Sequence, residues 1–164
     1  MRLLTALNAR LSRWAMYMAC ACLAGLLCVV VYGVVLRYVM NDAPPYVEQV
    51  ALLLVVSVAM FGAAAGTRDA GHIGLDSLVR RLSERWQFWC AVGTFVLGTV
   101  FGATLLWGSA EMAASTHAST IPTLGISEAY RYVPVFIGGL LIALFSLEHL
   151  LARVRGTEVI QSWY

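Results

Sequence analysis

The chain has 164 residues, of which 60% are hydrophobic and 12% are charged, whereas about 25% of the residues of an average soluble protein are charged. This composition, with a mean hydropathy of +0.78, indicates an integral membrane protein. The formal net charge of +2 is too small to indicate a nucleic-acid partner.

Four long intervals of the sequence contain no charged residue. A bilayer core of about 30 Å is crossed by roughly 20 apolar residues of helix. The sequence therefore predicts a single all-α membrane domain over residues 1–164. The intervals lie between Arg13 and Arg37, Glu48 and Arg68, Arg85 and Glu111, and Arg131 and Glu148, and they place four transmembrane helices at about residues 14–36, 46–67, 86–107 and 129–151.

The segment before the first span has leucines at helical spacing. Residues 1–12 are therefore predicted to form either a short interfacial helix or an extension of the first span. After that span, Asn41, Asp42, Pro44 and Pro45 predict a tight turn, because proline fixes φ and Asn and Asp favour turns.

Two opposite charges flank this turn. Glu48 lies in the first turn of the second span, where a carboxylate suits the positive end of the helix dipole. Arg37 ends the first span. It is interpreted either as a helix cap balanced by Asp42 or Glu48, or as a contact with an external partner.

The stretch Phe61 to Asp76, FGAAAGTRDAGHIGLD, joins the second span to a polar segment. Gly62 and Gly66 form a GxxxG pattern, which allows close helix approach. Arg68 is predicted to anchor the helix at the membrane surface. His72 and Asp76 are interpreted either as a capped turn or as a docking point for another membrane subunit. They precede an amphipathic segment, about residues 75–85, which is predicted to lie along the headgroups as an interfacial helix.

The third span carries a second GxxxG pattern, at Gly98 and Gly102. We expect at least one of the two patterns to close the four-helix bundle. Ser127 is predicted to cap the fourth span, and Pro134, several residues inside that span, is expected to bend it.

The arginines are distributed unequally across the four predicted spans. Only Arg37 and Arg131 fall on one side, and the other nine of the 11 basic residues fall on the opposite side. The positive-inside rule therefore places both termini and the middle loop in the cytoplasm.

The centres of the predicted spans lack Asp, Glu, Lys, Arg and His. Transporters that carry an ion usually need such groups at membrane depth, so a self-sufficient, homo-oligomeric small transporter is disfavoured. The sequence also lacks GxSxG, HExxH and P-loop motifs, so we expect no enzyme activity and no catalytic residue, metal or cofactor in this chain.

The histidines leave one alternative open, a membrane anchor of a redox complex. His117 is predicted on the opposite side of the membrane from His72 and His149. Only His72 and His149 could meet, outside the hydrocarbon, so haem ligation fits poorly.

Several motifs together resemble the small membrane subunit, the DctQ type, of tripartite ATP-independent periplasmic (TRAP) transporters. They are RYVMN, YVEQ, FGAAAG and TRDAGHIGLD in the first half, and IPTLGIS and AYRYVPVFIGG in the second. The chain departs from the family at the start of span two, where Tyr46 stands for the usual Trp and Gln49 for the second of two acids.

The resemblance implies a small permease subunit in a bacterial inner membrane, spanning it several times. Its implied partners are a large TRAP membrane subunit, a periplasmic substrate-binding protein and membrane lipids, and sodium coupling for uptake of an organic acid is expected in the large subunit. We expect the chain to brace that subunit and to help receive the binding protein. The residues singled out as contacts or structural determinants are Arg37, Glu48, Gly62, Gly66, Arg68, His72, Asp76, Gly98, Gly102 and Pro134.

Overall fold

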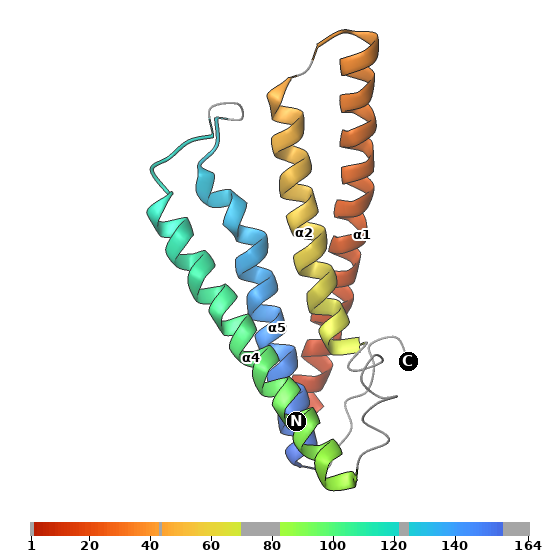
Figure 1. The fold of residues 1–164 in the computed structure, drawn as a ribbon, viewed down its shortest axis with the longest axis vertical. Coiled ribbons are helices and arrows are strands. Elements are labelled where there is room, and N and C mark those ends of the chain that lie inside the picture. Colours follow the sequence, from red (N-terminus) through yellow and green to blue (C-terminus); the bar gives the residue numbers. More distant parts are fainter. Residues whose placement is uncertain (1, 43, 70–82, 122–124, 156–164) are drawn as a thin grey trace.

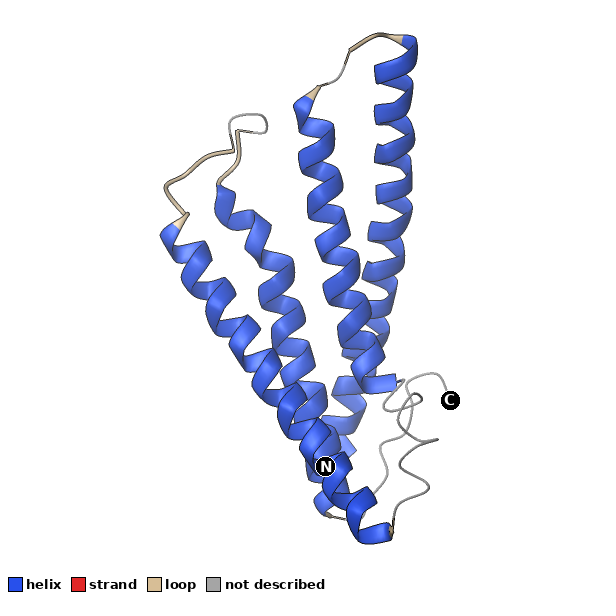
Figure 2. Cartoon of the chain, viewed as in Figure 1, coloured by secondary structure: helices blue, strands red, loops and turns tan. Residues whose placement is uncertain are grey.

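The computed structural model describes residues 2–42, 44–69, 83–121 and 125–155. Across these ranges the chain is helical, without strands (Figure 2). Its elements are α1 (Arg2–Val39), α2 (Pro45–Asp69), α4 (Glu84–Ser115), the short 3-10 helix η1 (Glu128–Tyr132) and α5 (Val133–Val154).

The long helices form two antiparallel hairpins, α1 with α2 and α4 with α5, and the hairpins meet mainly through α2 and α5. Figure 1 shows the hairpins close together where α1 begins and α5 ends, and diverging toward the opposite end. We call the first the termini end, with the start of α1 and the ends of α2 and α5. We call the opposite end the loop end; it holds the α1–α2 turn and residues 116–121 and 125–127.

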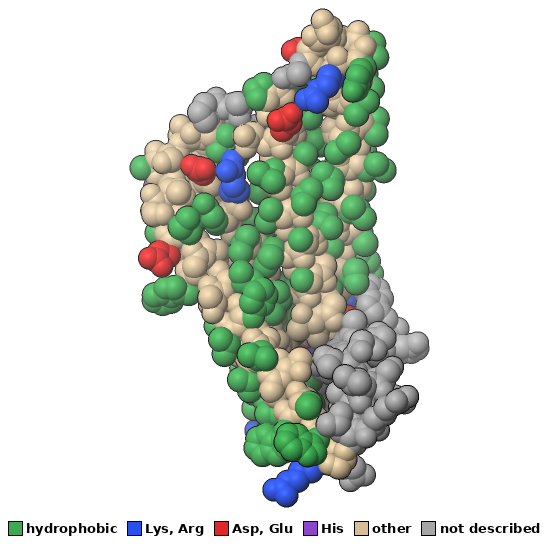
Figure 3. All heavy atoms as spheres, viewed as in Figure 1, with side chains coloured by type: hydrophobic (Ala, Val, Ile, Leu, Met, Phe, Trp, Pro, Cys, Tyr) green, Lys and Arg blue, Asp and Glu red, His purple; other side chains and the backbone are tan. Residues whose placement is uncertain are grey.

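Four helical segments are long and apolar enough to cross a membrane: Thr5–Val39, Pro45–Asp69, Arg85–Ser115 and Glu128–Val154. Large apolar side chains cover their outer surfaces (Figure 3). Such a surface suits lipid, because hydrocarbon does not penalise exposed apolar groups as water does. The predicted four-span, all-helical arrangement is confirmed in this respect.

The core lies where α1, α2 and α5 come together. Ala64, Ala65 and Phe145 are each 0% exposed, and Ala15, Ala19 and Phe61 with Leu141 and Ile142 complete this cluster. The alanines let the helices approach closely, and Phe145 of α5 fills the space left between them.

Helix ends differ from the predicted spans in two places. α1 is continuous from Arg2, so residues 2–12 extend the first span. α4 continues to Ser115, beyond the predicted limit at residue 107, because the Ala, Glu and Met residues there have high helix propensity. Most of the predicted interfacial helix, together with His72 and Asp76, lies outside the described residues. Only its last three positions are described: residue 83 precedes α4, and α4 begins at Glu84.

The prediction that Pro134 bends the fourth span is wrong. The α-helix begins at Val133, so Pro134 lies in its first turn, where its missing N–H leaves no helical hydrogen bond unmade. The 3-10 helix η1 forms the preceding turn, and Ser127 caps it by accepting a hydrogen bond from the Ala129 N–H at 3.3 Å. The predicted capping role of Ser127 is thus confirmed, for η1.

Candidate functional site

A buried arginine joins three helices at the termini end. The Arg68 side chain, 1% exposed, lies near the end of α2. Its Nε donates to Glu148 Oε2 of α5 at 3.3 Å, its Nη1 lies 3.5 Å from Asp69 Oδ1, and its Nη2 donates to the Thr5 carbonyl oxygen of α1 at 3.3 Å. The attraction between these paired charges is stronger here than in water, because the dielectric constant inside the bundle is low.

Polar residues of α1 complete the arrangement. Asn8 Nδ2 donates to Glu148 Oε2 at 2.8 Å, and Ser12 Oγ donates to Asp69 Oδ2 at 2.7 Å. Both residues are buried. The α1 helix therefore contacts each of the two carboxylates that neutralise Arg68.

His149 of α5 extends these contacts to α4. Its Nε2 lies 3.0 Å from the Arg68 carbonyl oxygen, which can only accept, so Nε2 carries the proton. Its ring stacks on Phe95 of α4 with a centroid distance of 5.1 Å and an interplanar angle of 2°. We call Asn8, Ser12, Arg68, Asp69, Glu148 and His149 the charge cluster.

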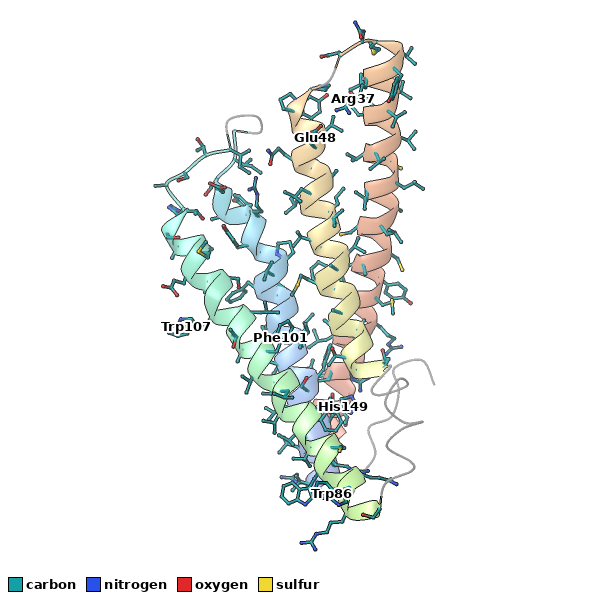
Figure 4. The ribbon with its side chains drawn as sticks, viewed as in Figure 1. Arg37, Glu48, Trp86, Phe101, Trp107 and His149 are labelled. Atoms are coloured by element: carbon teal, nitrogen blue, oxygen red, sulfur yellow. The ribbon has the colours of Figure 1, made fainter. Side chains whose placement is uncertain are left out.

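The charge cluster shows which groups Arg68 contacts, and these contacts were not predicted from the sequence. The residue lies inside the bundle, and Glu148, 80 residues away in sequence, is its partner there. Glu148 and Asn8 were not among the predicted site residues. The sequence contained a signal for this pair, because two opposite charges end apolar segments that are predicted to reach the same membrane face. Figure 4 shows His149 at the end where the hairpins converge.

The two GxxxG patterns have different environments. A Cβ atom added to Gly102 would lie 2.5 Å from the Ala143 nitrogen and 2.8 Å from the Gly139 carbonyl oxygen, and one added to Gly98 would lie 2.6 Å from Ser146 Oγ. These glycines therefore bring α4 against α5, as predicted for at least one pattern. Gly138, next to Gly139, faces α2 instead, since its added Cβ would lie 2.8 Å from Met60 Cβ.

Gly62 and Gly66 pack against no other helix among the described residues. A Cβ atom added at either position would have none of the described atoms outside its own helix backbone within 4 Å. This half-exposed face of α2 is therefore open to lipid or to another protein.

The described helices thus form two hairpins that the charge cluster joins at the termini end, with the small-residue face of α2 at Gly62 and Gly66 left open. The family model of the tripartite ATP-independent periplasmic transporters, DctQ component, matches residues 26–156, more than half of the chain. The chain belongs to this family. It is thus a multi-pass membrane protein and the small permease component of a TRAP transporter. No curated protein matches the chain significantly.

The loop end of this DctQ component carries two ion pairs. Arg37 Nη2 lies 3.0 Å from Glu48 Oε1, with the side chains 56% and 74% exposed. The proximity expected from sequence is therefore present (Figure 4). Arg131 Nη1 lies 3.4 Å from Glu128 Oε1 on the other hairpin.

Arg131 also connects the two hairpins, because its Nη2 donates to Gln49 Oε1 at 2.7 Å. Gln49 stands at the position where the resemblance led us to expect an acid. Here the amide oxygen accepts the hydrogen bond that a carboxylate would accept as part of an ion pair. The departure therefore retains the contact and removes one charge.

We expect Gln49→Glu to stabilise the purified chain by about 0.5–1 kcal/mol, because it converts this partly exposed hydrogen bond into an ion pair. Gln49→Leu should destabilise it by a similar amount. Thermal unfolding in detergent, followed by tryptophan fluorescence, measures both effects. In an Arg131→Gln background the gain from Gln49→Glu should vanish, and a gain that persisted there would contradict the assignment.

Proposed function

We propose that this DctQ component braces the large membrane subunit of its transporter and helps to receive a periplasmic binding protein, during sodium-coupled uptake of an organic acid. The observation that carries the proposal is the charge cluster. Arg68 and Glu148, the buried charges among the described residues, bind each other and polar groups of α1. Charges neutralised in this way fix helices in place instead of carrying an ion.

The open face of α2 supports the same role. Gly62 and Gly66 contact no other helix in the part of the chain that the structure describes, whereas Gly98 and Gly102 pack against α5. Small residues drive helix association in lipid by allowing close backbone approach. We propose that a helix of the large subunit packs against Gly62 and Gly66.

The orientation belongs to the proposal as well. Arg10, Arg13, Arg85, Arg153 and Arg155 are exposed residues at the termini end. The positive-inside rule supports placing this end in the cytoplasm of a bacterial inner membrane. The loop end, with its two ion pairs, then faces the periplasm and any binding protein that docks there.

Reconstitution tests the division of labour. Proteoliposomes that contain this chain alone should show no uptake of an organic acid under a sodium gradient. Proteoliposomes with the large subunit and the binding protein should show uptake, and omission of this chain should abolish it. The measurement is uptake of radiolabelled substrate, with vesicles lacking the gradient as the control. Sodium-driven uptake by this chain alone would overturn the proposal.

A further inference from the structure

A groove lies between α1 and α2 near the loop end, with a volume of about 290 Å³. Most of its lining is apolar, including Val30 and Val34 of α1 and Val47 and Ala51 of α2. Val30 and Val34 are 46% and 51% exposed, whereas Val47 is 9% exposed. The exposed valines therefore form the rim of the groove and Val47 forms part of its floor.

A close helix approach shapes this floor. A Cβ atom at Gly33, which also lines the groove, would lie 2.8 Å from Val47 Cγ1. The missing side chain at Gly33 therefore lets Val47 sit directly against α1. The result is a shallow apolar channel on the outer surface of the α1–α2 hairpin.

The Arg37–Glu48 ion pair also lines the groove. Arginine has five N–H donors, and this ion pair uses one of the two terminal nitrogens, so further donors are available to an incoming anion. Both side chains are more than half exposed. The groove thus presents a cation and an anion side by side at the margin of an apolar channel.

We propose that the groove binds one phospholipid with an ethanolamine headgroup. An acyl chain lies along Val30, Val34 and Ala51, the lipid phosphate binds Arg37, and the primary ammonium group binds Glu48. This headgroup carries the two charges that the pair complements. A choline headgroup has no N–H to donate to Glu48, and a glycerol headgroup has no cation for it.

The exposed Arg37–Glu48 pair at the margin of the groove favours a zwitterionic lipid headgroup over an apolar helix of another protein. A volume of about 290 Å³ lies at the lower end of small-molecule pockets. A flexible acyl chain fits such a channel.

Native mass spectrometry of the full chain, with phosphatidylethanolamine, phosphatidylcholine and phosphatidylglycerol of matched acyl chains, tests this proposal. We expect the ethanolamine lipid to be retained about fivefold more than either other lipid, which corresponds to about 1 kcal/mol. Arg37→Gln and Glu48→Gln should each abolish this preference. Ala51→Phe should fill the channel and reduce binding of all three lipids, and Val34→Phe, at the exposed rim, provides the same test if the first variant does not fold.

Glu128→Gln is the matched control, because it removes an acid from the other ion pair at the loop end and should leave the preference unchanged. Equal retention of the three lipids, or a preference that survives Arg37→Gln, would overturn the proposal. Loss of the bound ethanolamine lipid on assembly with the large subunit would also overturn it and would assign the groove to a protein contact. The readout needs no transport, so the proposed function and this site can fail independently.

Discussion

Glu148→Leu is expected to destabilise the bundle by about 3–5 kcal/mol, because it removes the carboxylate that binds the buried Arg68 guanidinium from α5 and leaves Asp69, on the same helix as Arg68, as the remaining carboxylate of the cluster. Arg68 is 1% exposed and cannot turn to water without separating α2 from α5. Asn8 loses its acceptor in the same variant. The measurement is thermal unfolding of the purified chain in detergent, together with the yield of monodisperse protein.

The double variant Arg68→Met/Glu148→Leu provides the decisive control. Replacement of a buried ion pair by apolar side chains of similar size is often neutral, whereas loss of one partner is not. We therefore expect the double variant to be clearly more stable than Glu148→Leu alone. Glu111→Leu, on an exposed acid of α4, should change stability little. A single Glu148→Leu variant as stable as the parent chain would show that the cluster does not hold the helices together.

Glu148 also explains why this cluster is more than a simple pair. Its Oε2 accepts from both Arg68 and Asn8, whereas its Oε1 is buried without a hydrogen-bond partner among the described residues. An unpaired buried oxygen costs free energy, which the charge-assisted contacts of Oε2 offset. The cluster therefore gives positional specificity, fixing which helices meet, more than it gives net stability.

The four spans could be predicted from the sequence because the bilayer excludes charge, and charge-free intervals are visible without any knowledge of tertiary structure. The end of α4 could not be predicted in this way, because hydropathy indicates which residues can lie in the membrane and not where a helix ends. The helix continues for eight residues past the predicted limit at residue 107, through the charged Glu111 to Ser115. The predicted bend at Pro134 is wrong because the effect of a proline depends on where the α-helix begins. Here a 3-10 helix precedes it, so Pro134 lies in the first turn of α5.

The site was less predictable because its contacts are tertiary. Arg68 and Glu148 each resemble an ordinary charge at a membrane face until α2 and α5 are placed together. The two GxxxG patterns are equivalent as sequence, and only the helix opposite each one distinguishes them. Sequence patterns identify surfaces capable of close packing, and the fold decides which surfaces remain available to a partner.

The two glycine patterns should therefore respond oppositely to the same substitution. Gly102→Ala is expected to destabilise the chain by about 1–3 kcal/mol, because the new methyl group would overlap backbone atoms of Ala143 and Gly139, which cannot rotate away. Gly62→Ala places its methyl group in open space. It should leave stability unchanged or raise it by about 0.5–1 kcal/mol through helix propensity. Thermal unfolding of the chain alone compares the two, and equal destabilisation would contradict the assignment.

Larger side chains extend this contrast to assembly. Gly62→Leu and Gly66→Leu should leave the isolated chain folded and reduce co-purification with the large subunit by about tenfold or more, because a bulky side chain prevents close approach of a partner helix. Gly93→Leu is the matched control, since Gly93 is also a helical glycine with nothing within 4 Å of an added Cβ, but lies on α4. If Gly62→Leu and Gly66→Leu both assembled normally, the open face of α2 would be a lipid-facing surface, and the large subunit would contact another face of the bundle.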